Sequence, residues 1–137
     1  MTKQVIVMRK DLGMTKGKMI SQGAHASMGV LLKEMRGYDY QNYEAPATPY
    51  DLTLRVEEGS VWQEWLEGIF TKITLKCESE AELLSLLKTA EDSGLPCTLI
   101  TDVGLTQFKG LATNTCIAIG PALAEDIDKI TGHLKLY

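Results

Sequence analysis

The chain has 137 residues, of which 45% are hydrophobic and 23% are charged, and its formal net charge is −4. This length fits one domain with its own core, and the composition is that of a soluble globular protein rather than a disordered one. The acidic balance argues against a strongly basic nucleic-acid-binding protein, although a local basic patch is compatible with it. The apolar runs are far shorter than the roughly 20 residues of a membrane span. The apolar run near the start of the chain is too short for a signal peptide.

Strands and helices are predicted to alternate along the chain. The β-branched run at 3–9 predicts a buried strand. A helix is expected over 16–36, with Thr15 as its N-cap and Gly37 as its stop. The other expected elements are a short helix at 61–69, a strand at 71–77, a helix from the capping box at Ser79 to Gly94, strands at 96–102 and 113–119, and a helix that starts at Gly120-Pro121 and stops at Gly132.

This order predicts an α/β fold, a three-layer sandwich in one domain, with a mostly parallel sheet flanked by helices on both faces. Residues 38–58 interrupt the pattern and hold four of the five tyrosines. We expect an inserted loop there, with a short strand at 52–56. Loops of this length inside a compact domain are usually functional or disordered.

The three cysteines, Cys77, Cys97 and Cys116, are odd in number and widely spaced. Their spacing matches no zinc or redox motif. We therefore expect buried thiols in a reducing, cytoplasmic compartment.

A polar stripe runs along the helix expected at 16–36. Lys18, Gln22, His25 and Gly29 follow helical spacing and share one face. The opposite face is expected to be the buried one; its members are Ile20, Ala24, Ser27, Met28, Leu31 and Met35. The polar stripe is then either solvated surface or one wall of a site, and spacing alone favours solvated surface.

The glycine-lysine run before this stripe is not a P-loop. Gly13 and Gly17 are separated by three residues rather than four, and Met19 follows Lys18 where that motif needs Ser or Thr. The N-terminus of the helix still suits a phosphate, because its N–H groups lie near several basic residues. These are Arg9, Lys10, Lys16 and Lys18.

Asp102 ends a strand that is otherwise uncharged. Ligands of open α/β sheets bind beyond the carboxyl ends of strands, so Asp102 is a candidate site residue. A turn-forming Asp before Gly104 is an equally weighted alternative. Thr106, Gln107 and Thr113 add hydrogen-bonding groups at the same edge. The sequence supports no Ser-His-Asp or Cys-His arrangement.

Four segments resemble, in order, the signature blocks of the archaeal and eukaryotic type of peptidyl-tRNA hydrolase. They are VIVMRKDLGMTKGKMISQGAHA, LPCTLITDVGLTQ, AIGP and IDKITGHLKLY. The resemblance covers about residues 3–36 and 65–137. It implies a mixed four-stranded sheet flanked by helices, often in a dimer. It also implies hydrolysis of the ester between a peptide and the 3′ end of tRNA, with no metal or organic cofactor.

The resemblance implies functional roles at Lys18, Gln22, His25, Asp102, Thr106, Gln107 and Thr113. Ester hydrolysis needs a placed water and a group that stabilises the oxyanion. We expect Asp102 to orient the water and Lys18 to stabilise the oxyanion, with Thr113 and Gln22 positioning the substrate. His25 would contact the tRNA end or protonate the leaving ribose oxygen.

This chain departs from the family pattern in four places. Gly23 stands where the family usually has Cys, and Leu105 where it has Arg. Residues 109–112 replace a shorter turn, so Thr115 is an alternative to Thr113. Residues 38–58 have no counterpart.

The expected partner is tRNA, with no membrane contact. Its phosphates would meet Arg9, Lys10, Lys16, Lys18 and Lys109. The tyrosines of the insertion, Tyr38, Tyr40, Tyr43 and Tyr50, would stack on unpaired bases or, as the favoured alternative, pack within the loop or against a second subunit. A homodimer is compatible with the resemblance. The competing interpretation is a non-catalytic member that binds tRNA or protein.

Overall fold

The computed structural model of the chain describes residues 1–37, 44, 47–105 and 107–137. The elements are, in order, β1 (Thr2–Arg9), α1 (Lys16–Arg36), α2 (Val61–Glu67), β2 (Lys72–Cys77), α3 (Glu80–Asp92), β3 (Cys97–Asp102), β4 (Thr113–Leu123) and α4 (Ala124–Thr131). This order agrees with the alternation expected from the sequence. No helix among the described residues is both long enough and apolar enough to span a membrane.

The four strands form one mixed sheet in the order β2-β1-β4-β3. β1 pairs with β2 in parallel, whereas β4 is antiparallel to both β1 and β3. The expected mixed α/β sheet is therefore confirmed, but the expectation that it is mostly parallel is wrong. The physical reason is the connection at 103–112, whose described residues, 103–105 and 107–112, form no helix and return the chain directly, as antiparallel neighbours allow.

Two further expectations are corrected at the level of single elements. Gly120-Pro121 does not start the last helix, because β4 continues to Leu123 and pairs there with the start of β1. Gly120 has a φ of +103°, and a Cβ at this position would lie 2.6 Å from the carbonyl oxygen of Lys3, so glycine is needed for close strand approach. Residues 52–56 form no strand.

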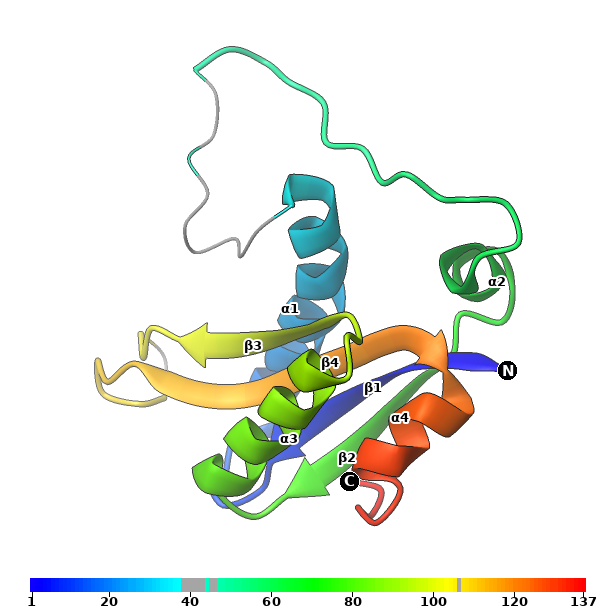
Figure 1. The fold of residues 1–137 in the computed structure, drawn as a ribbon. Coiled ribbons are helices and arrows are strands. Elements are labelled where there is room, and N and C mark those ends of the chain that lie inside the picture. Colours follow the sequence, from blue (N-terminus) through cyan, green and yellow to red (C-terminus); the bar gives the residue numbers. More distant parts are fainter. Residues whose placement is uncertain (38–43, 45–46, 106) are drawn as a thin grey trace.

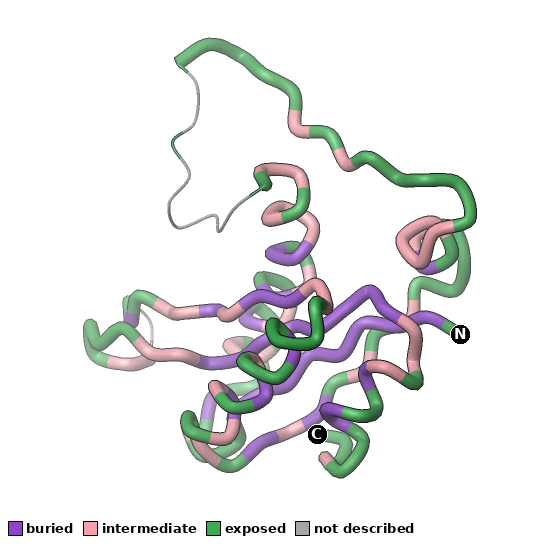
Figure 2. The backbone as a smooth tube through the Cα atoms, in the orientation of Figure 1, coloured by how far each residue is buried: buried purple, intermediate pink, exposed green. Residues whose placement is uncertain are grey.

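Helices cover both faces of the sheet, as expected (Figure 1). α3 and α4 pack on one face, where Leu83, Ile117 and Ile127 are fully buried. α1 packs on the opposite face, mainly over β3 and β4. Figure 2 shows the strands as the most continuously buried part of the chain, with exposed helix surfaces on either side.

The segment between α1 and α2 runs outside these layers, and most of its described residues, 47–60, are exposed (Figure 1). The chain returns to the body at α2. There Trp65 is 1% exposed, and its indole N–H donates to the carbonyl oxygen of Thr71 at 2.8 Å. The buried Trp65 thus attaches the end of the insertion to the body of the protein.

Candidate functional site

Helix α1 begins where the sequence predicts. The Thr15 hydroxyl accepts a hydrogen bond from the Lys18 amide at 3.2 Å, which is the usual N-cap geometry. Gly37 ends the helix in the left-handed region, with its N–H bonded to the carbonyl oxygen of Lys33. These caps place Lys18 in the first turn and fix the register of the side chains that follow.

The face of α1 that meets the sheet is the opposite of the expected one. Gln22, Ala26, Gly29 and Val30 are the buried residues of α1, whereas Ile20 is 73% exposed. The expectation that the polar stripe faces away from the core is therefore wrong. The members of the stripe at Lys18 and Gln22 can face the sheet because they find charged and hydrogen-bonding partners there.

Those partners converge on Asp102, at the end of β3. The Lys18 ammonium lies 2.7 Å from Asp102 Oδ1, and the two side chains are 11% and 12% exposed. The Gln22 amide donates to the same oxygen at 3.3 Å, and the backbone N–H of Gly104 donates to Oδ2 at 2.9 Å. Three donors from two segments of the chain thus hold one shielded carboxylate.

These donors lower the pKa of Asp102 below its ordinary value. The largest cause is the hydrogen bond from Lys18, followed by the opposing effect of burial and then by the bond from Gly104. Hydrogen bonds and a nearby cation stabilise the charged form of a carboxyl group. Asp102 is consequently ionised at neutral pH and is a weak proton acceptor.

A β-bulge adds Thr115 to this network. The pairing of β3 with β4 shifts between Ile100 and Thr101, so that Thr115 falls out of the regular ladder. Thr115 is fully buried, and its hydroxyl donates to Gln22 Oε1 at 2.5 Å. Bulges re-aim side chains next to active sites. Here the bulge lets Thr115 face α1 together with Cys116, whose thiol contacts the Gln22 carbonyl oxygen.

Thr113 lies beside Asp102 rather than within the network. The two residues are directly paired across β3 and β4, so their side chains share a face of the sheet. The Thr113 hydroxyl donates to the carbonyl oxygen of Leu111 at 3.0 Å. Both threonines considered from the sequence are therefore close to the carboxylate, Thr113 at its rim and Thr115 beneath Gln22.

Gln107 joins the loop after β3 to the start of α1. Its amide nitrogen donates to the Gly13 carbonyl oxygen and its oxygen accepts from the Thr15 amide, each at 3.2 Å. The Gln107 side chain is thereby held between two backbone groups. Thr106 lies outside the described residues. His25 is exposed on α1, in the stripe of Lys18 but outside the bonded network.

The basic residues expected to bind phosphate separate into two groups. Lys10, Lys16 and Lys109 are exposed. Arg9 is 8% exposed, and its guanidinium donates to both Asp11 oxygens, to Glu80 and to the Asn114 carbonyl oxygen. The hydrogen bond to Asp11 raises the pKa of Arg9 and lowers that of Asp11. Because these contacts occupy its guanidinium, we do not retain Arg9 as a phosphate contact.

Several other predicted groups lie apart from the network. Tyr38, Tyr40 and Tyr43 fall outside the described residues, while Tyr50 is 44% exposed in the insertion. Burial raises the pKa of the Cys77 thiol to about 11 and that of Cys116 to about 12, which makes both poor nucleophiles at neutral pH. Within residues 1–37, 44, 47–105 and 107–137, no group of His, Cys, Asp and Glu is suited to hold a metal ion.

Sequence reasoning missed two contributors to the site. The sequence predicts only a turn at Gly104, yet the Gly104 N–H donates to Asp102. Its φ is +85°, and a Cβ there would lie 2.6 Å from backbone atoms of Leu111, which excludes a side chain. Phe108 is the second contributor, since its ring centroid lies 5.5 Å from the Lys18 ammonium. The D-x-G spacing could have revealed Gly104, but an aromatic residue in a loop carries no comparable signal.

Comparison with known proteins identifies the family to which this chain belongs. The family described as peptidyl-tRNA hydrolase PTH2 matches residues 2–137. A peptidyl-tRNA hydrolase of Methanocaldococcus jannaschii is 42% identical, with 98% of each chain covered. One from Methanopyrus kandleri is 39% identical, with 99% of this chain and 98% of the relative covered.

A solved structure of a protein of unknown function from Agrobacterium tumefaciens shares the fold. It has a TM-score of 0.56 at 13% identity and covers 99% of this chain and 97% of its own. At that identity the likeness concerns the fold alone. The match along residues 2–137, together with the two archaeal relatives, establishes that this chain belongs to the peptidyl-tRNA hydrolase PTH2 family.

Proposed function

We propose that this protein hydrolyses the ester bond between a peptide, or an N-blocked amino acid, and the 3′ end of tRNA, and so recycles peptidyl-tRNA. The observation that carries the proposal is the shielded Lys18–Asp102 pair, 2.7 Å apart at the first turn of α1, in a chain of the PTH2 family. A protein that only binds the phosphates of RNA gains nothing from a carboxylate beside Lys18, because like charges repel.

Asp102 acts in this proposal as an orienting group. Its lowered pKa makes it a poor general base. An ionised carboxylate has more acceptor sites than Lys18, Gln22 and Gly104 fill, so it can accept a hydrogen bond from a water molecule. That bond would polarise the water and aim its lone pair at the ester carbonyl. As the new C–O bond forms and the ester C–O bond breaks, the proton that the water loses ends on the departing ribose 3′ oxygen.

Lys18 would stabilise the negative charge that develops on the carbonyl oxygen. An ammonium carries several N–H donors, so its bond to Asp102 is compatible with a bond to an oxyanion. Low exposure strengthens this electrostatic effect, because less water screens the charge. Thr113 would position the substrate, and exposed His25 would meet the tRNA end or the leaving ribose oxygen. Gln22, which is buried and bonded to Asp102 and Thr115, would hold the carboxylate in place instead of contacting the substrate as expected from the sequence.

The exposed Lys10, Lys16 and Lys109 would meet phosphates of the acceptor arm. The N-terminus of α1 adds its partial positive charge on the same side. Binding of this kind releases counterions, so tRNA affinity should fall as salt rises. An affinity that stays flat between low and moderate salt would contradict a tRNA substrate. A cytoplasmic location belongs to the same proposal, because peptidyl-tRNA arises at ribosomes.

A turnover assay on N-acylated aminoacyl-tRNA tests the proposal. Asp102→Ala and Lys18→Ala should each lower turnover by a factor on the order of 10² or more. The ion pair between Lys88 and Asp92 on α3 offers a matched control, since it is exposed and lies on the opposite face of the sheet. Lys88→Ala and Asp92→Ala should leave turnover unchanged.

Three outcomes decide between the functions considered. Loss of turnover only in the Asp102 and Lys18 variants supports the hydrolase. Near-normal turnover in both variants would eliminate the mechanism. A wild-type protein that binds tRNA without any turnover would leave the non-catalytic binding module instead. Circular dichroism of each variant separates a lost activity from a lost fold.

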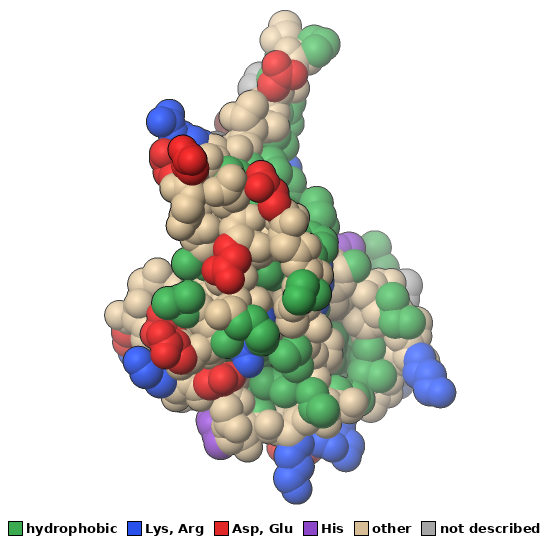
Figure 3. Space-filling view, turned by 90° about the vertical axis from the view of Figure 1, so that its right-hand side faces the viewer, with side chains coloured by type: hydrophobic (Ala, Val, Ile, Leu, Met, Phe, Trp, Pro, Cys, Tyr) green, Lys and Arg blue, Asp and Glu red, His purple; other side chains and the backbone are tan. Residues whose placement is uncertain are grey.

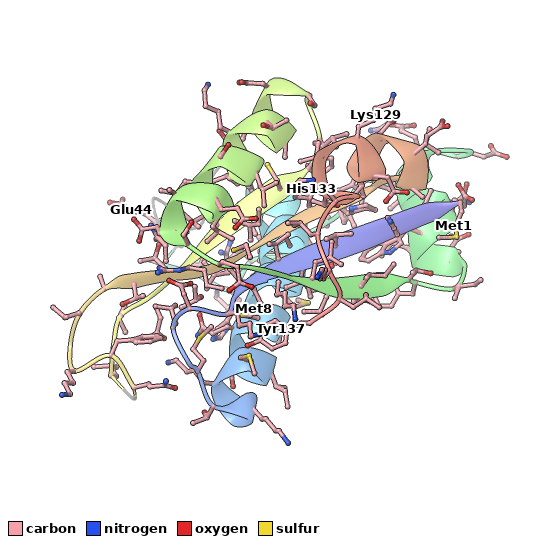
Figure 4. All side chains as sticks on the ribbon, turned by 90° about the horizontal axis from the view of Figure 1, so that it is seen from below. Met1, Met8, Glu44, Lys129, His133 and Tyr137 are labelled. Carbon is pink, nitrogen blue, oxygen red and sulfur yellow. The ribbon has the colours of Figure 1, made fainter. Side chains whose placement is uncertain are left out.

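We further propose that the protein is a homodimer. An apolar groove of about 790 Å³ lies where α1 leaves β1 and β2 uncovered. Large side chains around it, including Ile20, Met28 and Phe70, are between 43% and 73% exposed. Figure 3 shows hydrophobic side chains gathered on this side, and Figure 4 shows Met8 and Tyr137, which both line the groove, beside α1. Monomers rarely expose continuous apolar surface of this kind.

We propose that a second copy of this chain covers the groove. The family resemblance favours a dimer, and the exposed apolar residues Ile20 and Met28 lie on one helix, so a two-fold axis would bring the same residues of both copies together. Light scattering should give the mass of a dimer for the wild type and of a monomer for Ile20→Asp or Met28→Asp. A monomeric wild type at high concentration would contradict the dimer and leave the hydrolase proposal unaffected.

A further inference from the structure

The loop between β3 and β4, residues 103–112, is tied to Asp102 and to the segment that caps α1. Near its start, the Gly104 N–H donates to Asp102. Further along, Gln107 bonds to Gly13 and to the N-cap residue Thr15. Phe108 follows Gln107 directly in the sequence. The hydrogen bonds of Gln107 therefore place Phe108 near the first turn of α1, which contains Lys18.

The backbone around Phe108 is closely determined. The Leu111 amide donates to the Phe108 carbonyl oxygen at 2.9 Å, and the Gly110 amide donates to the Gly104 carbonyl oxygen at 2.8 Å. Lys109 has a φ of +52°, a left-handed conformation that is unfavourable for a residue with a side chain. Such outliers persist where surrounding structure over-determines them, and they cluster at functional sites. The strained turn at Lys109 holds Phe108 in place.

The Phe108 ring has two neighbourhoods. It is partly buried against the apolar cluster under α1, which includes Met14 and Ile100. The Lys18 ammonium lies 5.5 Å from the ring centroid, within the range of a cation–π contact. Lys18 is therefore in contact with an anionic oxygen of Asp102 and with an aromatic ring from the following loop.

An aromatic ring suits this position for a chemical reason. A lysine side chain is long and flexible, so an ion pair alone leaves it several rotamers. The ring attracts the ammonium without accepting its proton or forming a second ion pair. It also excludes water from one side of the charge, which keeps the electrostatic effect of the ammonium strong.

We propose that Phe108 is a positioning residue for Lys18: its ring confines the ammonium beside Asp102 so that the N–H donors of the ammonium aim at the ester oxyanion. This inference rests on the proposed hydrolase function. Phe108 itself touches no reacting atom in this scheme. Its contribution should therefore appear in kcat rather than in KM.

The test compares Phe108→Leu, which keeps apolar volume but loses the aromatic face, with Phe108→Tyr, which keeps both. Turnover is measured on N-acylated aminoacyl-tRNA, with thermal unfolding as the control for the fold. Phe108→Leu should lower kcat about five- to tenfold with KM unchanged, and Phe108→Tyr should retain most of it. In a Lys18→Ala background, Phe108→Leu should have no further effect.

A spectroscopic readout separates this inference from the function on which it rests. The NMR signals of the Lys18 side chain next to the ammonium should carry a ring-current shift that Phe108→Leu removes and Phe108→Tyr restores. Wild-type kcat in Phe108→Leu, or Lys18 signals that do not change, would overturn the positioning role while the hydrolase stands. An inactive wild type with the expected NMR shifts would overturn the hydrolase instead.

Discussion

The two faces of the sheet are built in contrasting ways. On the face covered by α3 and α4, Leu83, Ile117 and Ile127 are fully buried in one apolar cluster. On the face covered by α1, the helix meets the sheet through Gln22 and the Lys18–Asp102 pair as well as through apolar side chains. One face therefore supplies stability, whereas the other exchanges apolar contacts for a polar network that can perform chemistry.

The largest effect on stability should come from the α3–α4 face. Leu83→Ala removes a fully buried side chain and leaves a cavity, so it should lower the free energy of unfolding by about 2–5 kcal/mol. Urea unfolding measures the loss, and Leu136→Ala, at a 69% exposed position, should stay within about 0.5 kcal/mol of wild type. Folded Leu83→Ala protein should keep its kcat. A reduced kcat would show that the two faces are coupled.

Gln22→Ala should have an intermediate effect, and it should lower both the stability and the turnover. It removes the acceptor of the buried Thr115 hydroxyl and one donor to Asp102. We expect about 1–3 kcal/mol of lost stability, which is the range for a buried group deprived of its partner. We also expect about tenfold lower turnover, since one such contact is worth roughly 1.4 kcal/mol.

A double variant separates these two roles of Gln22. Replacing both partners with apolar groups can be nearly neutral for stability, so Gln22→Leu with Thr115→Val should recover much of the unfolding free energy. Turnover should remain low, because Asp102 still lacks its amide donor. Recovery of both properties together would mean that Gln22 serves the fold alone.

The stability that the Lys18–Asp102 pair contributes on the α1 face should depend on pH. The pKa of Asp102 is lower in the folded protein than its unfolded value of about 3.9. Its stabilising contribution is therefore present above the unfolded pKa and is lost as pH falls through the folded pKa. The loss of turnover that comes from protonation of Asp102 should therefore set in only below about pH 4, with circular dichroism confirming the fold.

Asp102→Asn is the control for this titration. The gap in unfolding free energy between wild type and Asp102→Asn should narrow as the pH drops below about 4. A gap that does not change with pH would assign acid sensitivity to other carboxyl groups.

The smallest effect is expected at the rim of the site. Leu105 is 86% exposed on the loop that follows Asp102. Leu105→Arg would add a cation near the proposed position of the acceptor arm. The slope of log tRNA affinity against log salt concentration should then become steeper by about the amount expected for one phosphate contact. Leu136→Arg adds the same charge on the C-terminal tail and should steepen it less. Equal changes in both variants would reflect net charge only.

Much of the fold was predictable because its signals are local. Caps at Thr15, Ser79 and Gly37 and the β-branched run of β1 mark elements that the structure contains. Strand direction was not predictable in this way. Alternation of strands and helices suggests parallel pairs, but the direction of β4 depends on a helix-free loop and on distant pairing with β1.

The orientation of α1 shows the same limit at the site. Ile20, Ala24 and Met28 form the more apolar face, and a rule based on hydrophobicity buries it. The structure instead buries Gln22, because Asp102 and Thr115, some 80 to 93 residues further along the chain, satisfy its amide. No local pattern records such partners. Two members of the polar stripe that spacing alone assigned to solvent, Lys18 and Gln22, form one wall of the candidate site.

The charge of the insertion between α1 and α2 affects how a charged partner approaches the protein. The charged residues of the insertion are Asp39, Glu44, Asp51, Arg55, Glu57 and Glu58. They sum to −4, the formal charge of the whole chain, so the rest of the protein balances to zero. The described part of the insertion lies toward the C-terminal end of α1 (Figure 1), whereas Lys18 and Asp102 lie at its N-terminal end.

A helix of 21 residues is about 30 Å long, so the described part of the insertion, which carries a net negative charge, stands away from the site. A polyanion approaching by diffusion is repelled more strongly by the insertion than by the neutral remainder of the protein. Encounters in the wrong orientation are thereby disfavoured before any contact forms. The insertion would then act as an orienting device that works without touching its partner.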